Sequence, residues 1–306
     1  MESAADFAGE FWNRDEARRD QMLYTAFCLV EAGLLNYALG RFLARRNVYD
    51  WASTSLYYSL LYSARLIIFL GVGDFPLGHS HIGALFTESE IKDKAWFRDL
   101  AKKVDPELGS LNPRQTFQKD VLSSRLLSRG ATQQNIDNAF DFFARNLKEA
   151  TKLRNDSSYE SLLVAHAYNH RRVTEAFEDL SAGLQMLSLR ANTIAIGVLT
   201  QVAKANTRLA YFTAFLNDRK NREGLYYFED HLKHRFSNEQ DISDHGEIIN
   251  ECIALVEPLR MDGRSDPEKA DSFRRNVSLE SFDSKSRLMN DFRNRSRRLR
   301  MVGEEA

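Results

Sequence analysis

The sequence predicts an all-α protein, and the distribution of helix-breaking residues is the first reason. Only five prolines and 15 glycines occur in 306 residues, and no proline lies between Pro113 and Pro258. A proline inside a helix costs about 3 kcal/mol, so this distribution permits long helices. Apolar residues also recur at steps of three and four, which is the period of a helix with one buried face. No strand pattern is found.

Two long helices open the predicted bundle. The first covers Arg18 to Arg46, and its apolar face is formed by Leu23, Phe27, Val30, Leu34, Leu35, Ala38, Leu39 and Phe42. After the turn NVYD, the second covers Trp51 to Leu70 and is apolar nearly all round, which is typical of a helix at the centre of a bundle. Its run SLLYSARLIIFLGVG contains Arg65 and is too short for a hydrocarbon core of ~30 Å, so we expect a buried helix there.

Loops and shorter helices follow. The segment GVGDFPLGHSHIG contains turn-forming glycines and Pro76, which predicts a loop, and VDPELGSLNPRQ predicts another irregular connection. Helical patterns cover Ser89 to Lys103, Gln118 to Arg129 and Thr132 to Arg154. The last of these has a clean apolar face, and we expect a break in the helix after Arg154.

A capping box predicts the start of the next helix. Ser157 and Glu160 have the S-x-x-E spacing in which the two residues satisfy each other's free backbone N–H groups. The helix that begins there is expected to reach Met186 or beyond, and Leu189 to Leu216 carries one or two more. Further amphipathic segments are Leu225 to Phe236, Glu247 to Leu259 and Ser281 to Leu299.

A domain boundary is expected between residues 190 and 220, because the chain becomes more polar after residue 217. We therefore divide the chain into a helical bundle, residues 1–190, and a C-terminal helical extension, residues 191–306. No linker rich in proline, glycine or serine marks this boundary.

The overall charge excludes a strong electrostatic attraction of the whole molecule to nucleic acid or acidic lipid. There are 42 basic and 43 acidic residues, a net charge of -1, so such a partner must meet a local patch. The two cysteines, Cys28 and Cys252, lie inside apolar runs, where a thiol behaves as a small hydrophobe. The N-terminus lacks the basic start and apolar run of a signal peptide. We expect a cytoplasmic protein with no membrane partner.

Three segments, in their order along the chain, resemble one known family. They are SLYYSLLYSARLIIFLG in the second helix, GHSHIGALF in the following loop and LRNDSSY at the break between two later helices. Their pattern resembles the HEPN superfamily of four-helix bundle domains over residues 18–190. The resemblance implies an antiparallel helical bundle, extended here by further C-terminal helices. It also implies a prokaryotic defence or toxin-antitoxin system as the biological context.

The resemblance implies a site at Arg154. HEPN ribonucleases carry an arginine, a polar residue directly after it, and a histidine separated from the arginine by four to six residues, at the start of the last core helix. Two copies of this motif meet in a dimer and cleave RNA without a metal. Histidine moves protons near the ribose 2′-OH, and arginine stabilises the phosphate charge. Here Arg154 and Asn155 match the pattern, but Tyr159 stands where the histidine is expected.

The tyrosine changes the expected chemistry. A phenol has a pKa near ~10 and stays protonated at neutral pH, whereas imidazole titrates close to neutrality. His166 lies about 13 Å along the helix from its start at Ser157, too far to share a phosphate with Arg154 of the same subunit. Three interpretations of Arg154, Asn155 and Tyr159 stay open: a helix end and cap without further function, an RNA contact without cleavage, and a nuclease site.

Three pairs of histidines are candidate ligands. His166 and His170, in HAYNH, have the spacing of two zinc ligands, but no third ligand and no HExxH signature accompany them. His79 and His81, in GHSHIG, can bind a ligand or have a packing role, and packing is favoured. His231 and His234, in EDHLKHR, fit a charged surface helix. We expect no metal site.

The C-terminal segment DFRNRSRRLR is the most concentrated basic patch. Its arginines are Arg293, Arg295, Arg297, Arg298 and Arg300. Arginine binds phosphate through two parallel hydrogen bonds, so this cluster can attract RNA or DNA of any sequence. Two alternatives stay open: arginines that neutralise a helix end and pair with acidic residues of the body, and a helix that docks on a partner.

Several catalytic classes lack their motifs. The chain has no P-loop, no glycine-rich dinucleotide fingerprint, no G-x-S-x-G elbow and no catalytic cysteine, so we expect no cofactor. Two functions stay open. The first is a HEPN-like protein that binds RNA or a partner protein of the same system, and the second is a metal-independent ribonuclease acting as a homodimer. The missing histidine favours the first, because losing a proton shuttle lowers a rate by ~10²-fold or more.

Overall fold

The computed structural model describes residues 16–72, 82, 86, 119–155, 170–218, 224–236, 242–260 and 266–277. Within these residues all regular secondary structure is helical and no strand occurs. The predicted all-α class is therefore confirmed for the described part of the chain.

Most described helices match the expected segments within a few residues. In chain order they are α2 (Glu16–Arg45), α3 (Tyr49–Val72), α7 (Lys119–Ser128), α8 (Gln133–Asn155), α10 (His170–Ala205), α11 (Leu209–Asn217), α12 (Leu225–Phe236) and α13 (Ile242–Arg260). Residues 267–277 form a further helix that the sequence did not predict. The expected helices at 89–103 and 281–299, and the capping box of Ser157 and Glu160, lie outside the described residues.

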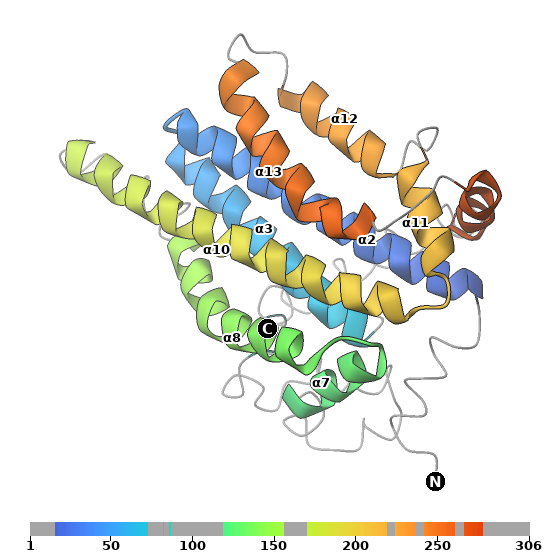
Figure 1. Cartoon of the computed structure of the whole chain (residues 1–306). Coiled ribbons are helices and arrows are strands. Elements are labelled where there is room, and N and C mark those ends of the chain that lie inside the picture. The colour runs from blue at the N-terminus through green and yellow to red at the C-terminus, as the bar shows by residue number, and fades with distance from the viewer. Residues whose placement is uncertain are drawn as a thin grey trace, which may run out of the picture.

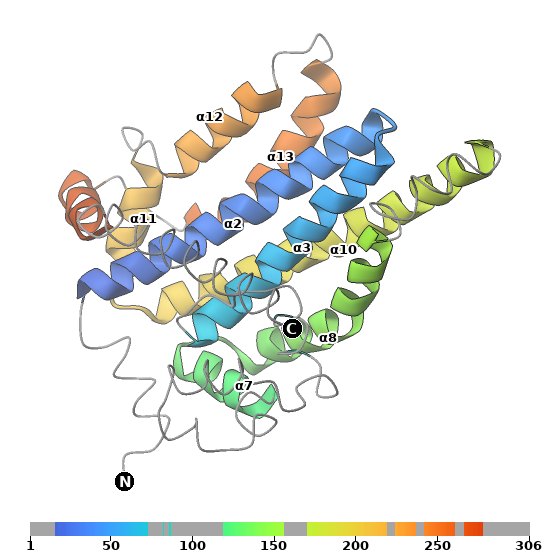
Figure 2. The ribbon, with the colours of Figure 1, turned by 180° about the vertical axis from the view of Figure 1, so that it is seen from behind.

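Three long helices form the centre of the bundle. α2 and α3 are an antiparallel pair joined at Asn47, whose φ of 59° gives the left-handed conformation of a tight turn. α10 packs against both helices, with α12 and α13 on one side of this group and α7 and α8 on the other (Figures 1 and 2). As expected of a central helix, α3 contacts α2, α7, α8 and α10.

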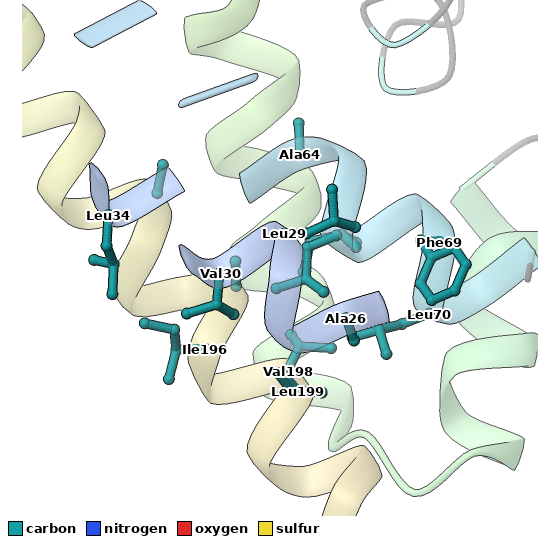
Figure 3. Packing of buried hydrophobic residues seen from close by; sticks show 14 of the residues in the cluster. Ala26, Leu29, Val30, Leu34, Ala64, Phe69, Leu70, Ile196, Val198 and Leu199 are labelled. Carbon is teal, nitrogen blue, oxygen red and sulfur yellow. The ribbon is translucent and has the colours of Figure 1, made fainter. Parts of the chain in front are cut away.

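One hydrophobic core joins these helices. Figure 3 shows side chains of α2, α3 and α10 meeting in it, among them Val30, Leu70 and Ile196. The same core continues to Phe228 of α12, Val256 of α13 and Phe273 of the last described helix. The apolar run of α3 is mostly buried in it, as expected for a core helix.

α10 differs from the expectation of two helices that meet near residue 189. It is one helix from His170 to Ala205, so the division between residues 190 and 191 falls inside it. Ser188 and Asn192, on either side of that division, are both buried against α3. The sequence pattern missed this continuity because the buried polar residues interrupt the apolar period of the helix.

Two helices meet a length and hydropathy test for membrane spans, over Arg19–Arg45 and Glu178–Ala205. Most of each apolar window is buried inside the bundle, at 61% and 56%. Core helices of water-soluble proteins pass the same test, so the observation is weak evidence for a membrane span.

A small polar seam sets the spacing of α2, α3 and α10. Asn192 donates hydrogen bonds to Ser59 Oγ and to Ser188 O, both at 2.8 Å. Ser188 Oγ in turn donates to the carbonyl of Leu56 at 2.5 Å. Opposite this network, α2 presents Gly33, where an added Cβ would lie 2.7 Å from Asn192 Oδ1. Only a glycine lets α2 approach the seam this closely.

A buried ion pair lies at the N-terminal end of α2. Asp20 is fully buried, and its carboxylate accepts hydrogen bonds from Nε and Nη2 of Arg208 at 3.0 and 2.7 Å. Asn276 Nδ2 donates to the same carboxylate at 2.8 Å, and Glu16 lies 3.2 Å from Arg208 Nη1. The guanidinium also lies 3.5 Å from the ring centroid of Tyr211. This cluster joins α2 to the α10–α11 turn and to the helix at 267–277.

Removing Asp20 should destabilise the protein strongly. Asp20→Ala leaves the buried guanidinium of Arg208 without its bidentate partner, which typically costs about 3 to 5 kcal/mol. Urea unfolding followed by circular dichroism measures this loss. Glu247→Gln is the matched control, because it breaks the Arg45–Glu247 pair whose carboxylate side chain is 70% exposed. That change should cost only about 0.2 to 1 kcal/mol. Equal losses in the two variants would contradict the role assigned to Asp20.

Two glycine substitutions should change stability in opposite directions. Gly33→Ala forces its Cβ against the amide of Asn192, which two hydrogen bonds hold in place, and should destabilise by about 1 to 3 kcal/mol. Gly183→Ala meets nothing within 4 Å and should stabilise α10 by about 0.5 to 1 kcal/mol. Thermal and urea unfolding of both variants tests the pair. A Gly33→Ala protein as stable as the wild type would show that the seam is not tightly packed.

Candidate functional site

The structure places only part of the expected site. Arg154 and Asn155 form the end of α8, at the position where the sequence analysis expected a helix to stop. Tyr159, His166 and the arginines at 293–300 lie outside the described residues, as do His79 and His81. His170 is the first residue of α10, and His231 and His234 lie in α12, but their side chains are outside the description.

Arg154 is held by its neighbour in sequence and by a ring of α3. Its Nε donates to Asn155 Oδ1 at 3.1 Å, and its Nη2 donates to the same oxygen. The guanidinium carbon lies 5.0 Å from the ring centroid of Tyr57. The polar residue after the arginine therefore orients the guanidinium plane, and the aromatic ring supports it from α3.

Tyr57 is a buried phenol under this cation. It is 1% exposed and interacts through its hydroxyl with the side chain of Thr151. Burial raises its pKa, an effect that the Thr151 hydrogen bond and the charges of Arg154 and Arg65 oppose but do not cancel. Tyr57 therefore stays protonated at neutral pH and supplies a ring and a hydroxyl, not a base.

A second arginine and two more tyrosines adjoin this pair on α3. The ring of Tyr58 packs edge-on to Tyr57 with centroids 5.6 Å apart, and the Arg65 guanidinium lies 5.4 Å from the ring centroid of Tyr62. Tyr58 and Tyr62 are half-buried against the core. We call these residues with the first pair the Arg–Tyr cluster: Tyr57, Tyr58, Tyr62, Arg65, Arg154 and Asn155.

Sequence reasoning missed most of this cluster. The motif YYSLLYSAR was treated as part of a buried helix, although its tyrosines are spaced by four and its arginine follows three residues later. That spacing places Tyr58, Tyr62 and Arg65 on one side of α3, which was a usable signal. The contact between Arg154 and Tyr57 joins residues 97 positions apart, so no local pattern could predict it.

The segment RLLSRG contains two buried arginines that were not predicted, one in α7 and one directly after it. Arg125 and Arg129 are 7% and 8% exposed, and Nη1 of Arg129 donates to the carbonyl of Leu70. Burial, with the nearby charge of Arg125, lowers the pKa of Arg129 to about 9. A cation at the last turn of α3 is favoured by the helix dipole, so Arg129 has a structural role as a cap.

The chemistry of the Arg–Tyr cluster suits binding better than proton transfer. Guanidinium groups bind phosphate, and phenol rings offer flat surfaces for nucleobases. The cluster consists of tyrosine, arginine and asparagine side chains and contains no imidazole to serve as a proton shuttle. Over the described residues, no group of three histidine, cysteine, aspartate or glutamate side chains could hold a metal ion.

Comparisons with known proteins give no match: no family model, no curated protein and no solved structure resembles the chain. The HEPN resemblance thus rests on the sequence segments alone and stays a prediction.

The burial of Tyr57 should appear as a loss of stability at high pH. Because its pKa is raised in the folded state, its contribution is fully present below the ordinary value of ~10 and declines as the pH rises through the folded value. Between the ordinary value and the raised folded value, the wild type should therefore lose up to about 1.4 kcal/mol more per pH unit than Tyr57→Phe. Urea unfolding at several pH values up to about 11 measures the difference, and parallel curves for the two proteins would refute it.

Proposed function

We propose that this chain is a HEPN-like helical protein of a prokaryotic defence or toxin-antitoxin system that binds RNA in the cytoplasm without cleaving it. The observation that supports this function best is the orientation of Arg154. Its guanidinium lies on the buried ring of Tyr57 and is fixed by Asn155 at the end of α8. A cation held in one orientation loses little conformational freedom when it binds a phosphate.

Binding is favoured over cleavage because the cluster has no proton shuttle. Metal-independent RNA cleavage needs a group that accepts a proton from the 2′-OH and one that donates to the leaving group. Burial keeps Tyr57 protonated, and the sequence has Tyr159 at the position of the motif histidine. An arginine alone stabilises charge on the phosphate but moves no proton.

Charge removal at Arg154 should weaken RNA binding. A hydrogen bond to a charged group contributes about 1.5 to 3 kcal/mol, so Arg154→Gln should bind labelled RNA about 10- to 150-fold more weakly. Asn155→Ala should have a smaller effect in the same direction, because it removes the side chain that orients Arg154 but leaves the charge of Arg154 in place. Fluorescence anisotropy with a labelled RNA, at several salt concentrations, measures the affinities.

Arg190→Gln is the matched control for this experiment. Arg190 lies 5.9 Å from the ring centroid of Phe142, so it makes the same kind of contact elsewhere on the bundle. RNA binding should be nearly unchanged in this variant. If the wild type binds no RNA, or if both arginine variants lose affinity equally, the proposal fails and a partner protein becomes the better candidate.

The same RNA tests the ribonuclease alternative. Incubation in the presence of a metal chelator should leave it intact, whereas metal-independent cleavage that Arg154→Gln abolishes would establish the enzyme. Size-exclusion chromatography with light scattering gives a companion result. A homodimer is expected from the HEPN resemblance, and a clean monomer would count heavily against a two-subunit nuclease site.

A further inference from the structure

The outward side of α3 carries an aromatic row that the fold does not need. Trp51, Tyr58, Tyr62 and Arg65 follow one another at steps of seven, four and three residues. At about 100° per residue these steps place all four side chains within one side of the helix. We call these four residues the α3 row. The opposite side of α3, including Leu60 and Ile67, is fully buried in the core.

The first residue of this row is unusually exposed for such a large ring. Trp51 is 67% exposed, although burying a side chain of this size would stabilise the protein. Tyr58 and Tyr62 are half-buried, so each has part of its ring against the core and part accessible. The row therefore presents aromatic side chains, two of which are held in place by packing against the core.

Arg65 adds a positive charge to the row. Its guanidinium lies over the ring of Tyr62, and among the described residues it has no carboxylate partner. Its Nε is buried and makes no hydrogen bond. A guanidinium that rests on an aromatic ring and lacks an acidic neighbour is well suited to accept a phosphate. Arg154, on the adjoining ring of Tyr57, places a second cation beside the row.

We propose that the α3 row binds an unpaired, single-stranded segment of RNA. The accessible rings stack on successive bases, while Arg65 and Arg154 contact the phosphates. From Trp51 to Arg65 the row extends about 21 Å along the helix, which accommodates several nucleotides. A duplex fits less well because its bases already stack on each other and cannot meet the rings. This inference rests on the proposed RNA-binding function and names the form of RNA that the site takes.

A protein partner is the competing occupant, because tryptophan, tyrosine and arginine are also common in protein interfaces. Arg65 has no carboxylate partner within the part of the chain that the structure describes, and this positive charge favours the nucleic acid. Protein interfaces typically combine such anchors with an apolar core. The nucleic acid is therefore the occupant for which the row offers matching chemistry.

The test uses the full-length protein and a labelled oligouridine strand, followed by fluorescence anisotropy. Base stacking contributes about 1 to 3 kcal/mol per base, so Trp51→Ala should bind about 5- to 150-fold more weakly. Trp51→Phe keeps a ring and should retain most of the affinity. Arg65→Gln should weaken binding and flatten its salt dependence. Annealing the strand to its complement should lower affinity for the wild type, and an oligothymidine strand shows whether the 2′-OH matters.

Met186→Ala is the control, since Met186 on α10 is 72% exposed and lies outside the row. Circular dichroism melting checks that each variant folds. If the wild type binds no RNA, the proposed function itself fails. If the wild type binds RNA and Arg154→Gln weakens it, but Trp51→Ala and Arg65→Gln bind as the wild type does, the row is refuted while the proposed function stands. Equal binding of single strand and duplex also refutes the row.

Discussion

The contact between Gly33 and Asn192 determines how the rest of the bundle is arranged. Asn192 is fixed by Ser59 and Ser188, and Gly33 lets α2 approach this fixed amide. The contact sets both the distance of α2 from α10 and the rotation of α3 between them. On α3, Ser59 is buried in this seam, while the neighbouring Tyr58 and Tyr62 are only partly buried.

The ends of α2 are held by charges of different burial. The Asp20–Arg208 pair is buried, while the ion pair between Arg41 and Glu251, 2.5 Å apart near the C-terminal end of α2, is only partly buried. Tyr37 donates to the same Glu251 carboxylate at 2.9 Å, and burial raises its pKa. Buried pairs require defined geometry, whereas exposed pairs add little stability. These contacts attach the C-terminal helices to the central group, which agrees with a core that crosses the expected division at residue 190.

Helix number and position in the described part were largely predictable, because apolar periodicity and missing prolines are local signals. What escaped prediction depends on contacts between distant residues. The continuity of α10 through Ser188 and Asn192 needs partners on α3, which periodicity does not reveal. The second helix was read as apolar all round because tryptophan and tyrosine count as apolar, whatever their exposure. Arg154 and Asn155 were singled out from a motif, but their support by Tyr57 required the fold.

The two arginines of the Arg–Tyr cluster show why a motif alone does not establish an enzyme. Arg154 and Arg65 each lie over a tyrosine ring, and a ring beneath a guanidinium orients the cation without neutralising it. A guanidinium held in this way can bind a phosphate through two parallel hydrogen bonds. Proton transfer needs a group whose pKa lies near neutrality, and burial moves the pKa of Tyr57 away from it. The same burial that lets the Tyr57 ring support Arg154 thus keeps its hydroxyl protonated, so Tyr57 is not a base at neutral pH.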